Sequence, residues 1–168
     1  MRNIYVDIIE EIKNRLEAQC TETGLLKDFK HVSFVDMVQQ AISNNNLPLI
    51  VLRINNAGEK IVANDGNNTP LASDISVDIH IISDLESKRD SNMYYNTTTK
   101  RGILYYYTYV LDAINTNLDG TKDCKLRGLL RQKMLARLDS ITVTERTSEA
   151  IITLDMTSKE FGFSGRNY

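Results

Sequence analysis

The chain has 168 residues, of which 42% are hydrophobic and 25% are charged, a composition that supports one globular domain with an apolar core. Its formal net charge of -2 creates no global field towards nucleic acid or anionic lipid, so a polyanion contact would need a local basic patch. No apolar run approaches the roughly 20 residues of a membrane helix, and the acidic N-terminal residues do not fit a secretory signal. We therefore expect a single soluble domain over residues 1–168, with no membrane partner.

The first part of the chain predicts a helix and then an ambiguous segment. Apolar residues recur at helical spacing over residues 4–20, which predicts an amphipathic helix. Within residues 29–43, a short strand could lie near residues 31–34, and Asp36 could cap a helix that continues through Ile42.

The middle of the chain predicts strands. Residues 47–54 form a dense apolar run of strand length, residues 55–58 have the composition of a turn, and residues 59–63 could return as a second strand. Residues 65–70 are the most loop-like segment. Residues 75–82 alternate between apolar and polar side chains, which predicts a half-buried strand.

The last part of the chain predicts two helices and a hairpin. Residues 84–99 are polar and are expected to form a loop or to lead into a helix. The strongest helical pattern covers residues 100–118, and a second covers residues 124–138. Two alternating segments, 141–147 and 150–156, meet at a turn at residues 147–149 and predict a β-hairpin. The core stripe of the first helix is expected to contain Ile103, Tyr107, Val110, Leu111, Ile114 and Leu118. Helices and strands in this order predict an α+β fold.

The cysteines and histidines form no metal-binding or redox motif. Cys20 and Cys124 belong to no CxxC pair and are expected to be reduced thiols in a cytosolic protein, with a disulfide as the alternative. His31 and His80 lack the spacing of zinc ligands. His80 is expected on the polar face of its strand, where it is solvated or hydrogen-bonded. The sequence predicts no cofactor.

The sequence also contains no phosphate-binding loop and no nucleophile motif, so we do not expect an enzyme. One acidic constellation is the enzyme alternative. Magnesium-dependent nucleases of the PD-(D/E)xK type place carboxylates and a lysine along a strand, where they hold the metal and stabilise the attacking hydroxide. Glu86 and Lys88 nevertheless fall beyond the last alternating apolar residue, where a solvated loop is expected. The residues that resemble this pattern are Asp74, Asp78, Asp84, Glu86 and Lys88.

A basic segment is the main local charge bias in the chain. It could contact phosphate, form a solvated face, or pair with an acidic surface of a neighbouring subunit. The N-terminal helix offers such an acidic surface at Asp7, Glu10, Glu11 and Glu17. Lys125, Arg127 and Arg131 are therefore candidate subunit-interface residues. The whole segment contains Lys122, Lys125, Arg127, Arg131, Lys133 and Arg137.

The tyrosines are concentrated in one region, because six of the eight lie between Tyr94 and Tyr109. Tyr107 belongs to the predicted core stripe, whereas Tyr105, Tyr106 and Tyr109 project away from it. Aromatic residues that remain after the core stripe is filled are enriched at protein interfaces, so these three are candidate interface residues. The alternative is that another element of the same subunit covers them.

The order of these elements resembles the tail terminator, or tail completion, proteins of long-tailed bacteriophages and related contractile devices. Three features carry the resemblance: the apolar segment LPLIVL at residues 47–52 after an N-terminal helix, the alternating segment SVDIHIISD at residues 76–84 before a long helix, and the closing pair of strands. These features cover most of the chain, but they are patterns of hydrophobicity and order, not a specific motif.

The resemblance implies a mixed, mainly antiparallel sheet packed by two or three helices. It also implies a structural protein of the virion, assembled in the host cytoplasm, that forms a hexameric ring at the junction of tail and neck. Such a ring stops growth of the tail tube and joins the tail to the neck. The expected partners are other copies of the chain, the tail tube protein, the sheath in a contractile tail, and a neck or head-completion protein, with DNA only as cargo passing through the lumen. Rival hypotheses are a tail tube subunit, another neck connector, a nuclease, and a nucleic-acid-binding module that would use the basic segment.

Overall fold

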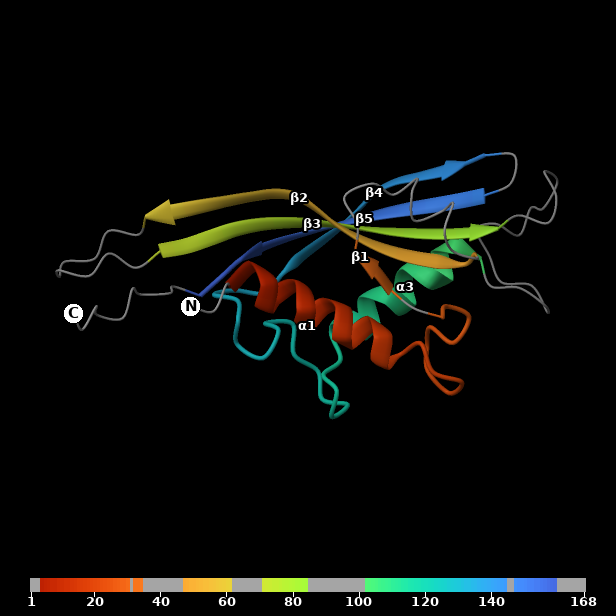
Figure 1. The fold of residues 1–168 in the computed structure, drawn as a ribbon, viewed down its shortest axis with the longest axis horizontal. Coiled ribbons are helices and arrows are strands. Elements are labelled where there is room, and N and C mark those ends of the chain that lie inside the picture. The colour runs from red at the N-terminus through yellow and green to blue at the C-terminus, as the bar shows by residue number, and fades with distance from the viewer. Residues whose placement is uncertain are drawn as a thin grey trace.

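The computed structural model describes residues 4–30, 32–34, 47–61, 71–84, 102–144 and 147–159. Within these ranges the chain forms two helices and five strands (Figure 1). This composition confirms the predicted α+β class. In chain order the elements are α1 (Ile4–Ala18), β1 (Val32–Phe34), β2 (Leu49–Ile61), β3 (Leu71–Asp84), α3 (Ile103–Ile114), β4 (Leu135–Val143) and β5 (Thr147–Thr157).

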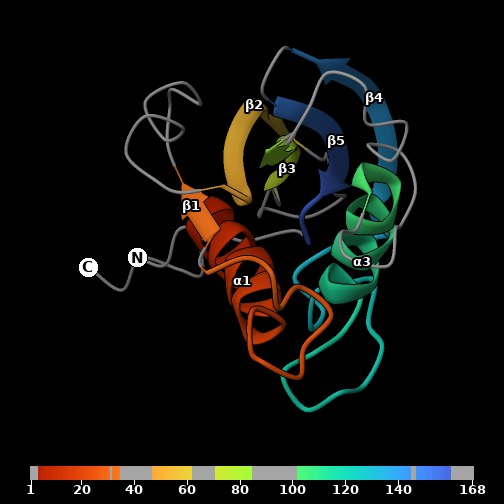
Figure 2. The ribbon, with the colours of Figure 1, turned by 90° about the vertical axis from the view of Figure 1, so that its right-hand side faces the viewer.

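The strands form one sheet in the order β1-β2-β3-β5-β4, with α1 and α3 on the same face of the sheet (Figure 2). β1 pairs with β2 in parallel, and the other three pairings are antiparallel. The sheet is therefore mixed and mainly antiparallel, as the resemblance implies. The predicted C-terminal hairpin is confirmed as β4 and β5, but its turn comes earlier than predicted, where the amide of Thr144 donates to the carbonyl of Thr147 at 2.8 Å.

The core lies between the sheet and the two helices. On β3, side chains from Ile75 to Ile81 alternate, and the apolar set on the inner face is at most 2% exposed. Burying each such side chain contributes roughly 1.5–3 kcal/mol. The helices meet this layer with residues at helical spacing, such as Ile8 and Ile12 of α1 and Val110 of α3, which are fully buried. The period-two and helical patterns of the sequence thus converge on this main core, and a smaller buried cluster of Leu49, Val51 and Ile82 lies on the other face of the sheet.

The predicted turn at residues 55–58 and the predicted return strand at residues 59–63 are wrong. β2 continues through this region to Ile61, and the strand beside it is β3. The register shifts between Ile54 and Asn56, which marks a bulge. The asparagines therefore interrupt the ladder locally without ending the strand. The predicted loop at residues 65–70 lies outside the described residues.

The predicted helix at residues 124–138 is also wrong. Leu126 and Arg127 have φ angles of 49° and 55°, in the left-handed region, so the chain turns there instead of coiling. The Asp123 carboxylate accepts hydrogen bonds from the amides of Lys125 and Arg127, which stabilises this turn. Leu126 and Leu130 are nevertheless fully buried. The four-residue spacing of these leucines, which resembles that of a helix, therefore comes from a loop that packs into the core.

The segment at residues 29–43 is only partly described. The predicted short strand is confirmed as β1, whereas the helix predicted from Asp36 lies outside the described residues. The predicted polar segment at residues 85–99 also lies outside them. Leu118, expected in the core stripe of the long helix, comes after the end of α3 and is 55% exposed.

Candidate interaction surfaces

The tyrosines of α3 divide into buried and exposed members. Tyr106 is 6% exposed, its ring meets that of Phe29 edge-to-face at 4.8 Å, and its hydroxyl donates to Asp28 at 3.0 Å. Tyr106 therefore belongs to the core of its own subunit, so its assignment as an interface candidate is corrected. Tyr107, which was expected in the core stripe, is only half-buried, because the buried face of α3 is rotated towards Tyr106 and Phe29.

Tyr105 and Tyr109 remain at the surface. Tyr105 is 41% exposed and Tyr109 is half-buried, and their rings lie 6.2 Å apart with an interplanar angle of 61°. They are four residues apart and so lie one above the other on the helix. This tyrosine pair offers two aromatic bodies with polar tips, the side-chain type that is enriched at protein interfaces.

The loop that contains the basic segment is tied to α1 by a buried arginine. Arg15 is fully buried, and its Nη1 donates to the carbonyl oxygens of Ile114 and Asp123 at 2.7 and 2.8 Å. Its Nε donates to Glu11 at 2.8 Å, and its Nη2 donates to the side-chain oxygen of Asn117. One guanidinium thereby donates hydrogen bonds both to a carbonyl group at the end of α3 and to acceptors in the following loop.

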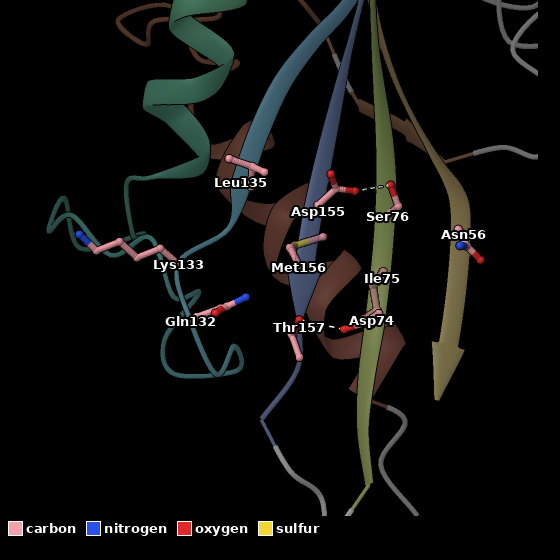
Figure 3. A pocket seen from close by; sticks show the side chains of 10 residues that line it. All are labelled: Asn56, Asp74, Ile75, Ser76, Gln132, Lys133, Leu135, Asp155, Met156 and Thr157. Carbon is pink, nitrogen blue, oxygen red and sulfur yellow. Dashed lines mark hydrogen bonds between the residues drawn. The ribbon is translucent and has the colours of Figure 1, made fainter. Parts of the chain in front are cut away.

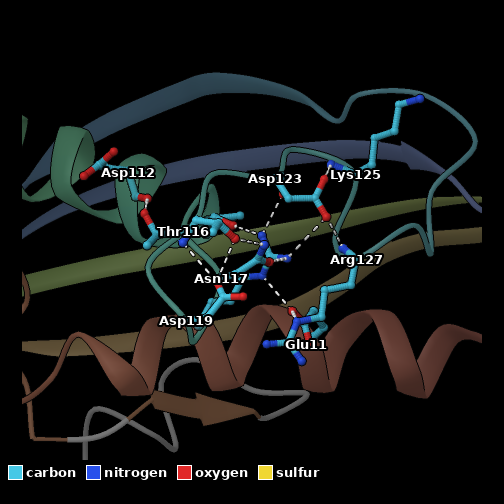
Figure 4. A network of polar contacts seen from close by, with 11 residues as sticks. Glu11, Asp112, Thr116, Asn117, Asp119, Asp123, Lys125 and Arg127 are labelled. Carbon is cyan, nitrogen blue, oxygen red and sulfur yellow. Dashed lines mark hydrogen bonds and ion pairs between the residues drawn. The ribbon is translucent and has the colours of Figure 1, made fainter.

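The three basic interface candidates lie in different environments. Arg127 forms an ion pair with Glu11 of its own chain at 3.4 Å, so the acidic helix and the basic segment meet within one subunit at this position. Lys125 is exposed, and its side chain points away from the network around Arg15 (Figure 4). Arg131 is also exposed, and its amide donates to the carbonyl of Thr157 at 2.9 Å. The structure therefore spreads these residues along a loop instead of aligning them on one helix.

The outer face of the sheet, opposite the helices, carries polar pairs between β3 and β5. Asp74 accepts from Thr157 at 2.9 Å, and Asp78 accepts from Thr153 at 2.7 Å. His80 contacts Glu149 at 2.7 Å, which confirms that it is hydrogen-bonded, but it is only 7% exposed and so is not solvated. The acidic side chains of the nuclease-like pattern that are described therefore take part in cross-strand pairs.

The remaining residues of the nuclease-like pattern cannot be placed beside them. Glu86 and Lys88 lie outside the described residues, as does the side chain of Asp84. Among the described residues, no group of three or more histidine, cysteine, aspartate or glutamate side chains could hold a metal ion.

A pocket of about 330 Å³ lies at one end of this outer face (Figure 3). Asp74 and Asp155 line it from β3 and β5, Leu135 lines it from the first position of β4, and Lys133 lines it from the segment just before β4. Ser76 donates to Asp155 at 2.9 Å. Both carboxylates are thus bonded to neighbouring side chains, and the lining is of mixed charge, which favours no particular ligand.

Sequence reasoning missed two features. One is Arg15, whose position three residues after Ile12 placed a cation on the buried face of α1. The other is β4, because the sequence pattern predicted a helix over its first residues. The β-branched residues of β4 are Ile141, Thr142 and Val143, so the alternation of a strand is visible only from residue 141, and residues 135–140 give no such signal.

The described helices contain none that is long and apolar enough to cross a membrane. Neither a scan against known protein families nor a search of curated proteins finds a match to this chain.

Proposed function

We propose that this chain is a structural subunit of a phage tail or tail-like device, a tail terminator that assembles into a ring on the end of the tail tube. The ring stops tube growth and docks the tail to the neck. Its partners are other copies of the chain, the tube protein, the sheath where one exists, and a neck protein. It needs no cofactor and has no catalytic residues.

The observation that carries the proposal is the arrangement of the elements. An N-terminal helix, an apolar strand, an alternating strand, a second helix and a closing hairpin follow one another along the chain. They build a mixed, mainly antiparallel sheet covered on one face by the two described helices (Figure 2). This is the fold that the resemblance implies, although folds alone do not specify function.

The tyrosine pair on α3 supports assembly as the mode of action. A ring needs a heterologous interface, in which one face of each subunit fits a different face of the next. The exposed ring of Tyr105, next to the half-buried ring of Tyr109, is an aromatic anchor of the kind that dominates binding energy when a partner covers it.

A tube-capping experiment tests the proposed function. Tail tube protein from the same phage or device would be polymerised with and without the purified chain, and tube lengths and tube ends would be imaged. We expect shorter tubes whose ends carry added density, because a bound ring blocks the addition of further subunits. Unchanged lengths with bare ends would contradict the proposal. Cleavage of DNA by the pure chain in the presence of Mg²⁺ would favour the nuclease instead.

A variant at the tyrosine pair tests the surface that we assign to assembly. Tyr105→Ala combined with Tyr109→Ala should leave the melting temperature nearly unchanged and weaken self-association by about tenfold or more, since anchor residues typically contribute at least 1.4 kcal/mol. Leu118→Ala is the matched control, because Leu118 is 55% exposed and follows the same helix. If the double variant unfolds the subunit, the two rings belong to its own fold and not to an interface.

A further inference from the structure

The two strands at the edges of the sheet, β4 and β1, differ in length, with nine and three residues. β4 ends the sheet on one side and β1 ends it on the other (Figure 2). β4 has nine residues and, among the described strands, pairs only with β5. An edge strand presents main-chain N–H and C=O groups that can pair with another strand, and proteins usually blunt such an edge with charge, proline or a cover.

β4 carries three large apolar side chains that are exposed at this edge. Leu135, Leu138 and Val143 are 60%, 36% and 40% exposed. Large aliphatic side chains at an exposed edge favour association with another chain. β4 also carries two exposed charged residues, Arg137 and Asp139, and a bulge between Leu138 and Ser140. The charges lie towards the other face of the sheet, where Arg137 pairs with Asp155 at 3.3 Å and Asp139 accepts a hydrogen bond from Thr153.

The register shows which face of the sheet these side chains occupy. Leu138 stands opposite Ile152, a core residue, so it lies on the face that the helices cover. Val143 stands opposite the fully buried Ser148 and lies on the same face. Both remain substantially exposed, so α1 and α3 leave this margin of the inner face uncovered.

The opposite margin has the same character. Phe34 of β1 stands opposite Leu52, which is also a core residue, so Phe34 too lies on the helix-covered face. It is 45% exposed. The two margins of one sheet thus present apolar side chains on the same face.

We propose that the chain binds a second copy of itself edge to edge, with β4 of one copy beside β1 of the next. The sheet then continues from copy to copy, and Phe34 of one copy packs against Leu138 and Val143 of its neighbour. This contact is heterologous, because it joins two different surfaces, and it leaves one β4 edge and one β1 edge free until a ring closes. The inference rests on the proposed self-assembly and assigns it a surface separate from the tyrosine pair.

Two variants, each defective at one edge, test the pairing. Phe34→Lys charges the β1 margin, and the double substitution Leu138→Lys with Val143→Lys charges the β4 margin. Each should weaken self-association by at least about tenfold, since a charge buried at an interface without a partner is costly. Val6→Lys is the control, because Val6 of α1 is 47% exposed and lies on neither margin. Circular dichroism of each variant establishes that it folds.

Mixing the two variants gives the sharper result. Each mixed pair still has one intact β1 margin and one intact β4 margin, so the mixture should form dimers that cannot grow, measured by sedimentation velocity. A mixture that stays monomeric, or variants that assemble as wild type does, would overturn the inference. If either charged variant fails to fold, Phe34→Ser and Val143→Ser replace them in the same mixing design.

The outcomes separate this inference from the proposed function. Rings that cap tubes and persist in both edge variants would overturn the edge pairing and leave the terminator function standing. Edge-dependent assembly into a species that does not cap tubes would support the pairing and contradict the terminator function. A wild-type chain that remains monomeric in free solution and at tube ends would overturn both.

Discussion

Arg15 is the residue that most clearly joins separate parts of the chain. It lies on the buried face of α1, yet it binds the carbonyl oxygen at the end of α3 and that of Asp123 in the following loop. Glu11, at 13% side-chain exposure, provides the balancing charge. A buried cation costs several kcal/mol unless hydrogen bonds and an opposite charge compensate it, and here both are present. Arg15 therefore fixes the position of the loop that follows α3 relative to α1.

Replacing Arg15 should destabilise the whole fold. We expect Arg15→Met to lower the free energy of unfolding by about 3 kcal/mol, because it leaves buried carbonyl groups without their donor and removes one of the two arginines that pair with Glu11. Arg15→Lys should recover part of the loss, since a lysine restores the charge without the planar fork. Lys13→Met is the matched control on the same helix, where the side chain is 39% exposed. Urea unfolding measures all three, and an Arg15→Met variant as stable as wild type would refute this role.

Cys20 makes a second prediction, which concerns pH. Burial, with a smaller contribution from the nearby Glu17 carboxylate, raises the pKa of the Cys20 thiol from 9.0 to about 11. The thiol also donates a hydrogen bond to the carbonyl of Leu16 at 3.3 Å. The fold therefore favours the protonated thiol, and the unfolded chain loses that proton at lower pH than the folded chain does.

Because the pKa of Cys20 is higher in the folded chain than in the unfolded chain, the free energy of unfolding decreases as the pH rises through this range. The stability that Cys20 contributes is complete below pH 9.0 and is lost as the pH rises towards about 11. Thermal melts across this window should show a steeper decline for wild type than for Cys20→Ala. Parallel curves for the two proteins would show that the thiol is equally acidic in both states.

At the scale of elements, the turn after α1 rests on a close backbone approach at Gly24. A Cβ atom at this position would lie 2.1 Å from the carbonyl oxygen of Gln19, which already accepts the amide of Leu26 at 2.9 Å. Gly120, by contrast, has a φ of +83° with nothing near the Cβ position. Gly24→Ala should therefore cost more than about 2 kcal/mol, and Gly120→Ala about 1 kcal/mol from backbone strain alone. Chemical denaturation of both variants checks the order, and an equal or reversed cost would contradict it.

The elements that could be predicted from the sequence are those whose side-chain pattern has a single explanation. α1 and β3 each bury one face, so their periodicity identifies them directly. Leu126 and Leu130 show why residues 124–138 could not be predicted: they fill the core from an irregular loop, at a spacing that a helix would also produce. The asparagines near residue 55 failed as a turn signal because β3 provides an equally long partner, which keeps β2 extended.

The candidate surface was predictable only in part, for a related reason. The 41% exposure of Tyr105 follows from the helical pattern, whereas Tyr109 is half-buried and packs partly against the core. Tyr106 could not be separated from them, because its burial depends on Phe29, which is distant in sequence and packs against its ring. The predicted strand at residues 141–147 included Val143 of the exposed β4 margin, but the incorrect helix at residues 124–138 hid Leu135 and Leu138.

At the scale of the whole molecule, two surface features support the proposed self-assembly. The tyrosine pair lies on a helix, and the apolar margins lie on the two outer strands of the sheet. A closed ring requires that every copy carries two different surfaces, one of which binds the other on the next copy. Whether copies close into a ring, and at what number, decides between a terminator and any other use of this fold.

The most direct measurement is therefore the mass and symmetry of the assembled particle, obtained by native mass spectrometry together with averaged electron micrographs of tube ends bound by the chain. We expect a closed ring with six-fold symmetry and six times the subunit mass of 19.1 kDa. A ring of another symmetry, an open filament, or tube ends without this chain would contradict the proposed hexameric terminator.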